Sequence, residues 1–240
     1  MAITSLLLIR IYYEQKQRQW VEEALQRAAE MSRERPPQQG DFLMNTPVPS
    51  QDVIDEFVGV SHGNLTRVKE LLGQYPVLVN AMATWGETPI QAAAQTGQEE
   101  IAKILLGAGA PLDICTAAML GMKEQVKSML HANSSLVHAI GAHEIPVMYY
   151  PILHNHVDIA ELLLSYGADI NAGEGKTTAL HGAVMFGQKA MVLWLLEHGA
   201  QVNLTDFEGK TPLRLAIEQQ QEDIAALLRR HGAIESKTDV

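Results

Sequence analysis

The stretch GKTPLRLA at residues 209–216 decides the fold of this chain. A related stretch, KTTALHGA, stands 33 positions earlier at residues 176–183, and GETPIQAA occupies residues 86–93. The ends of the repeated segments also match, with glycine-alanine pairs that begin at residues 109, 167, 199 and 232. Recurrence at a nearly fixed period indicates stacked supersecondary units, each packed on its neighbours.

The residue types in each copy favour a pair of antiparallel helices. Threonine-proline opens the first helix, because threonine accepts from free first-turn amides and proline needs no donor there. The alanines at 92–94 allow neighbouring layers to approach closely. In the second helix, Ile101, Ile104 and Leu105 share one face at i, i+3 and i+4. Gly109 then ends that helix, since glycine tolerates the left-handed conformation.

Together these signatures resemble the ankyrin repeat. The resemblance covers about three quarters of the chain. It implies an all-α repeat solenoid of about six helix-turn-helix units with short β-hairpin fingers, preceded by an N-terminal helix. We expect the repeat domain to span 52–235, followed by a tail at 236–240, with repeats near 52–80, 81–114, 115–140, 141–172, 173–205 and 206–235.

Two of the expected repeats are irregular. Turns between paired helices are predicted at positions 63, 97, 121, 155, 187 and 220, and the step from 97 to 121 is too short. The third repeat should therefore lack its leading finger. In the fourth repeat, Pro151 should kink the first helix or shift its hydrogen bonding. We expect the stretch from Cys115 to Pro151 to be the least stable part of the stack.

The amino-terminal region differs from the repeats. Residues 1–35 predict an amphipathic helix, with an apolar stripe from Trp20 to Ala28, and residues 36–51 predict a linker. Two interpretations remain open. The helix either pads the stack or pairs with a partner, or it is an extension upstream of a natural start at Met44. A dimerising coiled coil is a further reading, although the stripe is short for one.

Composition limits the classes of function. The chain has 240 residues, 47% hydrophobic, a net charge of −10 and a pI near 5.3, which argues against a nucleic-acid or membrane surface. The apolar run at residues 6–9 is shorter than the roughly 7–15 residues of a signal peptide core or the roughly 20 of a membrane span. A single cysteine, Cys115, predicts a buried apolar residue in a reducing compartment, so we expect a cytoplasmic protein.

The motifs that suggest a phosphate-binding or metal site are incomplete. Residues 173–178, GEGKTT, lack the first glycine of a phosphate-binding loop, and the same glycine-lysine-threonine recurs at 209–211 as a hairpin-to-helix turn. His154 and His156 are alternate residues at a helix end, where side chains point in different directions, so we expect them not to ligate one metal. His181 occupies the signature position whose imidazole, by resemblance, bonds the backbone of its neighbours. We expect no catalytic residue, no cofactor and no metal.

The resemblance implies a binding surface on the concave face, at finger tips and at the ends of first helices. Five of the expected contact residues are unusually apolar for such positions, which predicts either an exposed groove or local packing around the missing finger. The candidates are Trp85, Glu87, Gln95, Thr96, Met119, Leu120, His143, His154, Met185, Phe186, Phe207, Lys210 and Gln219.

The resulting prediction is a non-catalytic, monomeric scaffold that binds another protein or a peptide segment, with no nucleic acid and no membrane. The alternative is a small-molecule binder or enzyme that uses a pocket in the irregular third and fourth repeats. That pocket would be lined by Met119, His143, Tyr149, Tyr150 and His154.

Overall fold

A computed structural model of the chain describes residues 48–234. The expected amino-terminal helix at 1–35, most of the linker at 36–51, the question of Met44 and the tail at 236–240 lie outside these residues. The first described helix begins at Gln51, and the Ser50 hydroxyl accepts from the backbone amide of Val53. This helix therefore begins at the last residue of the expected linker.

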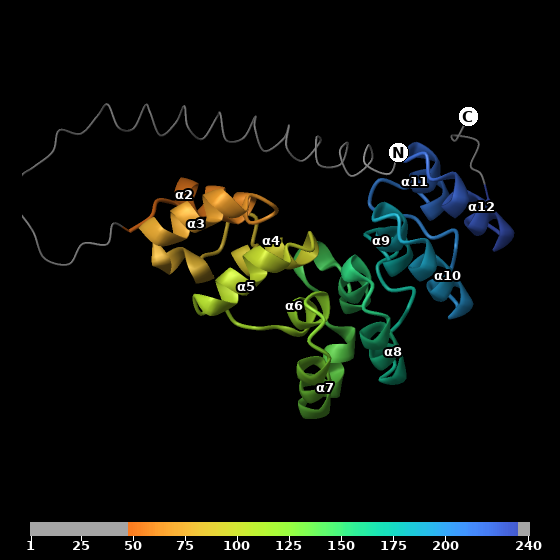
Figure 1. The fold of residues 1–240 in the computed structure, drawn as a ribbon, viewed down its shortest axis with the longest axis horizontal. Coiled ribbons are helices and arrows are strands. Elements are labelled where there is room, and N and C mark those ends of the chain that lie inside the picture. The colour runs from red at the N-terminus through yellow and green to blue at the C-terminus, as the bar shows by residue number, and fades with distance from the viewer. Residues whose placement is uncertain (1–47, 235–240) are drawn as a thin grey trace, which may run out of the picture. The chain divides into compact units, whose positions relative to one another are not determined.

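The described chain forms six successive pairs of short helices (Figure 1). The all-helical repeat fold is confirmed. The pairs are α2 (Gln51–Val60) with α3 (Leu65–Gln74), α4 (Pro89–Gln95) with α5 (Glu99–Gly107), α6 (Ile114–Met119) with α7 (Lys123–Ala132), η4 (Val147–His154) with α8 (Val157–Ser165), α9 (Ala179–Met185) with α10 (Lys189–Glu197), and α11 (Pro212–Glu218) with α12 (Glu222–Arg230). Short 3₁₀ helices lie between some of these pairs, namely η1 (Pro76–Asn80), η2 (Ser134–His138) and η3 (Ala142–Glu144).

The chain divides into two compact bodies. The amino-terminal body holds residues 48–93 and 100–110, and the carboxy-terminal body holds residues 94–99 and 111–234. In the amino-terminal body α2 packs on α3, and Val58, Ala83 and Ala92 form a buried cluster. In the carboxy-terminal body the first helices contact one another in the order α6, η4, α9 and α11. Each layer therefore buries its small and aliphatic residues against the next.

Polar side chains join the ends of successive repeats in the carboxy-terminal body. The Asn171 side chain donates to the carbonyl of Gly199 at 3.3 Å and accepts from the amide of Gln201 at 2.7 Å. Asn203 repeats this pattern one layer on, with the carbonyl of Gly232 at 3.1 Å and the amide of Ile234 at 2.9 Å. These two asparagines thus satisfy backbone groups near the helix ends that would otherwise lack partners.

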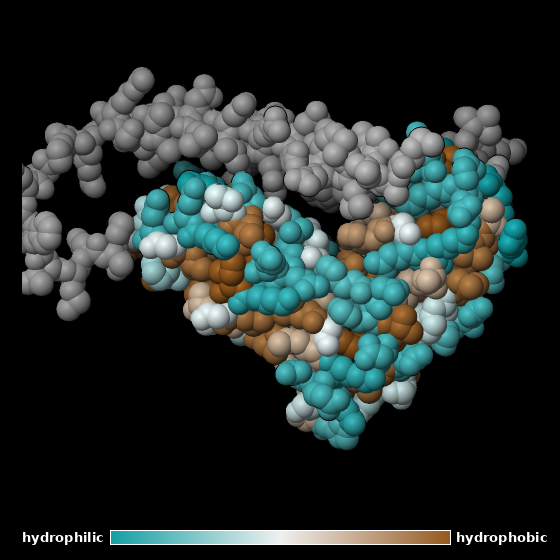
Figure 2. All heavy atoms as spheres, in the orientation of Figure 1, coloured by the Kyte–Doolittle hydropathy of each residue, from teal (hydrophilic) through white to brown (hydrophobic). Residues whose placement is uncertain are grey.

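The turns between paired helices lie where the sequence predicted them. Gly97, Gly121 and Gly187 adopt positive φ, and so do the two non-glycine residues at this position, Asn155 at 60° and Gln220 at 56°. The first turn differs, because Gly63 is not among the positive-φ glycines. The outer side of α7 is polar, and Figure 2 shows hydrophilic residues over it. This agrees with the exposed positions of Lys123, Glu124 and Lys127.

The third repeat lacks its finger, as predicted. Only six residues separate the end of α5 at Gly107 from the start of α6 at Ile114, and Asp113 caps α6 by accepting from the amide of Thr116 at 2.6 Å. The prediction for Pro151 is also confirmed. It lies inside η4, which is a 3₁₀ rather than an α-helix, since proline donates no amide and clashes with the preceding turn.

The fingers contain little β structure. Within residues 48–234, pairing is limited to two isolated bridges, an antiparallel one between Ile140 and Pro146 and a parallel one between Lys176 and Asp206. The expected hairpins are thus tight turns that support each other side by side. Each of the two bridges is therefore a single pair of residues rather than part of a strand.

Candidate partner-binding surface

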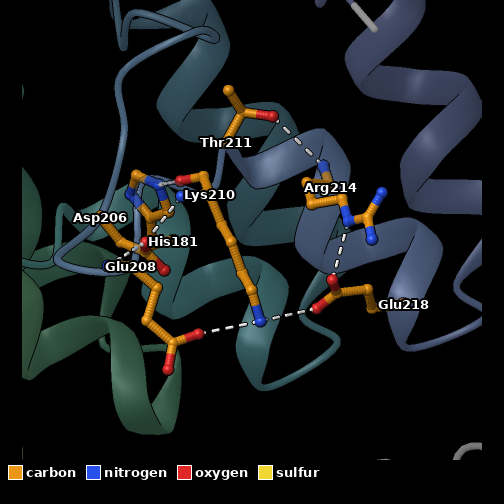
Figure 3. A network of polar contacts seen from close by, with 7 residues as sticks. All are labelled: His181, Asp206, Glu208, Lys210, Thr211, Arg214 and Glu218. Carbon is orange, nitrogen blue, oxygen red and sulfur yellow. Dashed lines mark hydrogen bonds and ion pairs between the residues drawn. The ribbon is translucent and has the colours of Figure 1, made fainter. Parts of the chain in front are cut away.

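The last finger, residues 203–211, is held rigidly by Asp206 (Figure 3). This carboxylate is 7% exposed, and its Oδ1 accepts from the backbone amides of Glu208 and Lys210, each at 2.9 Å. The Asp206 amide donates to the carbonyl of Lys210 at 2.9 Å, which closes the turn. Charge-assisted bonds of this kind are stronger than neutral ones, so the finger is fixed before any partner arrives.

His181 anchors the same finger from the neighbouring first helix. Its Nε2 lies 3.0 Å from the carbonyl oxygen of Lys210, and its Nδ1 lies 2.7 Å from the hydroxyl of Thr178. The ring is fully buried, and burial lowers the pKa of His181 below its ordinary value. The predicted structural role of this histidine is confirmed.

An ion-pair network runs from the finger along α11. Lys210 Nζ lies 2.8 Å from Glu208 and 2.9 Å from Glu218, and Arg214 donates to Glu218 at 2.7 Å (Figure 3). The hydrogen bonds that Lys210 donates to Glu208 and Glu218 raise the pKa of its ammonium group. Surface pairs contribute little stability singly. Here these pairs fix the positions of the charged groups.

Three successive fingers of the carboxy-terminal body are joined edge to edge. Gly175 donates its amide to Thr205 and Phe207 donates to Lys176, both at 2.8 Å. On the other side, Lys176 Nζ lies 2.7 Å from Glu144 in the preceding finger. We call the surface that these contacts hold together the finger surface, and define it by Ile140, Glu144, Lys176, Phe207, Lys210 and Glu218.

Phe207 is the most prominent aromatic side chain on this surface, with 67% of its area exposed. Met185, Phe186, Lys210 and Gln219 are half-buried, and Leu120 and Thr96 are likewise intermediate. Several predicted contact residues therefore remain accessible in the carboxy-terminal body.

Three predicted contact residues are buried, which corrects their assignment. Met119 is 0% exposed, Glu87 2% and Gln95 9%. Met119 packs inside the third layer, so the packing interpretation holds for it. Leu120, next to it, is only half-buried. The sequence could not separate these two, because they are neighbours at the carboxyl end of the short α6.

Trp85 and Glu87 lie on the finger of the amino-terminal body. Trp85 is 43% exposed, and its indole Nε1 donates to Glu87 Oε2 at 2.8 Å. The same carboxylate oxygen lies 3.5 Å from His62 Nε2. Asp55 fixes the finger from α2 by accepting from the amide and the hydroxyl of Thr84 at 2.9 and 2.8 Å. Glu87 is thus a buried support for Trp85 rather than a contact residue.

His154 and His156 join turns that lie far back in the sequence. His154 Nε2 lies 2.9 Å from the carbonyl of Gly97, and His156 Nε2 lies 3.1 Å from the carbonyl of Met119. His154 Nδ1 also lies 3.5 Å from Glu99. Both rings are half-buried. Their nitrogens serve backbone carbonyls, and no group of three potential metal ligands occurs within residues 48–234.

The fourth finger carries an unusual turn that the sequence did not reveal. His143 and Glu144 are consecutive non-glycine residues with φ of 54° and 59°. Such residues are uncommon in this region and cost free energy. The turn leaves Ile140 63% exposed, as a second apolar side chain on the finger surface. Nothing in the sequence signalled it, because neither glycine nor asparagine, the types that favour this conformation, stands between Ala142 and Pro146.

The tyrosines of the alternative pocket fill the space between helices instead. Tyr149 and Tyr150 are buried with their ring centroids 5.8 Å apart, edge to face. A Cβ added at Gly182 would meet Tyr149 at 2.7 Å, and one at Gly141 would overlap the Tyr150 hydroxyl. Both rings thus lie directly against glycine backbone. Met119 is buried and His143 exposed, so the five expected lining residues occupy different environments.

Two further observations concern the sequence predictions. Cys115 is buried, and burial together with Asp113 raises its pKa. This matches the expected inert, apolar role. No helix found between residues 48 and 234 combines the length and the hydropathy that a membrane span requires.

Comparisons with known proteins agree with the observed fold. The family model "Ankyrin repeats (3 copies)" matches residues 57–173, 114–206 and 173–239. The chain is 33% identical to cyclin-dependent kinase 4 inhibitor B of Rattus norvegicus over 52% of this chain and 95% of that protein. It is 29% identical to the nuclear factor NF-kappa-B p105 subunit of Gallus gallus over 73% of this chain and 20% of that protein.

One relative carries the name of an enzyme. The chain is 31% identical to palmitoyltransferase ZDHHC13 of Pongo abelii over 43% of this chain and 17% of that protein. The chain therefore spans a fifth or less of the palmitoyltransferase and NF-kappa-B relatives. It spans nearly all of the kinase inhibitor.

Proposed function

Since this chain belongs to the ankyrin-repeat family, a general protein-interaction module, we propose that it binds a peptide segment of another protein across its finger surface. Phe207 carries this proposal. Phe207 is 67% exposed, so a large aromatic surface is available to a partner. Large, central aromatic residues are the usual anchors of protein interfaces.

The rigidity of the finger strengthens the case for Phe207 as an anchor. The residue sits between Asp206 and Glu208, whose backbone groups are both engaged by Asp206 or Lys210. A loop that is already ordered loses little conformational entropy on binding. More of the contact free energy then appears as affinity.

The charges around Phe207 favour a basic partner segment. Glu144 and Glu218 lie on the finger surface, and Glu208 and the exposed Glu174 lie next to it in sequence. These four carboxylates outnumber by one the three cations that pair among them, Lys176, Lys210 and Arg214. The chain as a whole carries −10. A segment with an aromatic or aliphatic residue flanked by Lys or Arg would complement this surface.

We propose no catalytic activity for the chain. Its relatives include an inhibitor and a nuclear factor subunit by name, and its match to the palmitoyltransferase covers 17% of that protein. The reaction of that enzyme is not carried over. We further propose that the chain acts as a monomer in the cytoplasm, as its single buried cysteine favours a reducing compartment.

A peptide selection with the full chain tests this function. Peptides from a random displayed library would be selected on the chain, and their dissociation constants measured for the wild type, for Phe207→Asp and for Leu193→Asp. Leu193 is 38% exposed on α10, away from the fingers, and serves as the matched control. We expect basic peptides that lose about tenfold or more with Phe207→Asp and keep their affinity with Leu193→Asp. Equal effects of the two changes would refute the proposal.

A further inference from the structure

We propose that a proton on His62 controls the Trp85 side chain at the tip of the finger in the amino-terminal body, residues 81–88. With the proton in place the indole is held by Glu87. Without it the indole is released, while the backbone of the finger keeps its position. This finger belongs to a different body from the finger surface, so the proposal stands apart from the proposed function.

His62 lies between two groups that only accept hydrogen bonds. Its Nδ1 lies 3.1 Å from the carbonyl oxygen of Gly59, and its Nε2 lies 3.5 Å from Glu87 Oε2. A neutral imidazole carries a proton on one nitrogen, whereas the imidazolium carries one on each. The surroundings therefore suit the charged ring. The shorter contact, to Gly59, favours the neutral form that keeps its proton on Nδ1.

Glu87 passes the loss of the proton on to Trp85. Its side chain is 2% exposed, and the oxygen that faces His62 also accepts from the indole Nε1 at 2.8 Å. In either neutral form of the ring, this buried carboxylate loses its cationic partner, which is costly. Turning the carboxylate toward water relieves that cost and removes the acceptor of the indole. Trp85, already 43% exposed, then moves into solvent.

The backbone of this finger is held by bonds that do not involve the imidazole. Asp55 accepts from the amide and the hydroxyl of Thr84 at 2.9 and 2.8 Å. The amide of Ala83 donates to the carbonyl of Glu87 at 2.9 Å, and the amide of Gly86 donates to the carbonyl of Ala83 at 2.8 Å. None of these bonds uses the Glu87 carboxylate. The loss of the proton therefore moves side chains on a fixed frame.

The charge that acts on His62 is that of Glu87. Burial lowers the pKa of His62, but the hydrogen bond to Glu87 and its charge raise it, and the net pKa lies above 6.5. Asp55 is engaged within the finger, and Glu56 lies 2.7 Å from Arg67. The remaining charged residues of α2, α3 and α5 in this body are Asp52, Lys69, Glu70, Glu100 and Lys103. We therefore expect the transition above pH 6.5.

A full chain with Trp85 as its single tryptophan tests the proposal. Trp20 and Trp194 are replaced by Phe, because Trp194 stacks on His198 at 4.2 Å and would report that histidine. NMR follows the indole Nε1–H and the imidazole protons of His62 from about pH 5.5 to about pH 8.5, and acrylamide quenching follows Trp85 fluorescence. We expect one midpoint for both side chains. Quenching should rise with pH by at most about twofold, since 43% of the indole side chain is exposed already.

Two variants separate the steps. Glu87→Gln keeps an oxygen for the indole and offers an N–H to the neutral ring, so Trp85 should stay held at every pH. His62→Phe removes the proton site, so Trp85 should be released at every pH, and if this variant fails to fold, the Glu87→Gln profile decides alone. His131→Gln, at an exposed histidine on α7 in the other body, is the control and should keep the transition.

Three results would overturn the proposal. The first is an indole signal that stays constant while His62 titrates. The second is a transition that persists in Glu87→Gln. The third is a loss of helical circular dichroism with the same midpoint, because the whole body would then unfold rather than release one side chain. None of them changes the expected dependence of peptide binding on Phe207.

Discussion

The backbone amide of Phe207 donates a hydrogen bond of 2.8 Å to the carbonyl of Lys176, so the position of one finger tip is set by the finger before it. Lys176 is tied in turn to Glu144 in the finger before that. A disturbance in one finger should therefore affect its neighbours, and the predictions below use this dependence.

Asp206→Ala should destabilise the chain by about 1–3 kcal/mol, because two backbone amides lose a buried acceptor. Urea unfolding measures this loss. Asp206→Asn keeps one acceptor oxygen and should cost less. Asp223→Ala, on exposed α12, is the control and should change little, since its ion pair with Lys189 lies at the surface. If Asp206→Ala behaves like Asp223→Ala, the finger is not held as described.

Gly182→Ala should destabilise the chain by roughly 1–3 kcal/mol. The added methyl would meet ring atoms of the buried Tyr149 at 2.7 and 2.9 Å, and neither side has room to yield. Gly73→Ala in α3 is the matched helical control, because nothing lies within 4 Å of its added Cβ. That change should leave stability unaltered or raise it slightly. Thermal unfolding of both variants measures the difference in stability.

Deprotonation of His62 should lower the free energy of unfolding as pH rises. Burial lowers the pKa of His62, but the Glu87 carboxylate beside it outweighs burial, and the net pKa lies above 6.5. The folded state therefore keeps a proton that the unfolded state releases, so this contribution is complete below pH 6.5 and is lost as pH rises through the folded-state value. Unfolding free energies of the wild type and of Glu87→Gln, compared from about pH 6 to about pH 8.5, should converge at the alkaline end.

His181 should have the opposite effect. Burial lowers its pKa below 6.5, so the folded state stays neutral where the unfolded state takes up a proton. Its contribution is present above pH 6.5 and is lost as pH falls through the folded-state value. His181→Gln should flatten the loss of stability on the acid side. An unchanged acid profile in this variant would contradict the burial of a neutral imidazole.

Hydrogen exchange should be fastest between Cys115 and Pro151, apart from the loop tips. This stretch lacks a finger and contains a 3₁₀ helix, whose hydrogen-bond geometry is poorer than that of an α-helix. Exchange measured by mass spectrometry gives the protection of each helix. Highest protection in η4 would show that its buried side chains outweigh its backbone.

The regular part of this fold follows from local chemistry, and for that reason it could be predicted. Threonine caps at Thr178 and Thr211 and turn residues at Asn155 and Gln220 act on their immediate neighbours in the chain. The short third repeat could be read from spacing alone. The caps and turns depend on residues a few positions apart, and the short repeat on the step between the turns at 97 and 121, so no contact between distant residues is needed to predict them.

The candidate site was harder to predict, since it depends on contacts between distant residues. The sequence assigned Glu87 and Met119 to a contact surface, but His62 and the third layer bury them. The bond from His154 to Gly97 joins residues 57 positions apart. Ile140 was missed because its exposure follows from the left-handed turn at His143 and Glu144, which those residue types do not favour.

The finger tips are joined through backbone atoms, by the amides of Gly175 and Phe207 and the carbonyls of Thr205 and Lys176. Peptide groups are the same whatever side chain they carry, so the tip residues can vary without loss of the joints between fingers. Mutation can then change what the tips recognise while the platform persists, much as loops vary on an immunoglobulin framework. A combinatorial library restricted to positions 174, 207 and 208 would exploit this freedom and yield binders of new specificity on an unchanged scaffold.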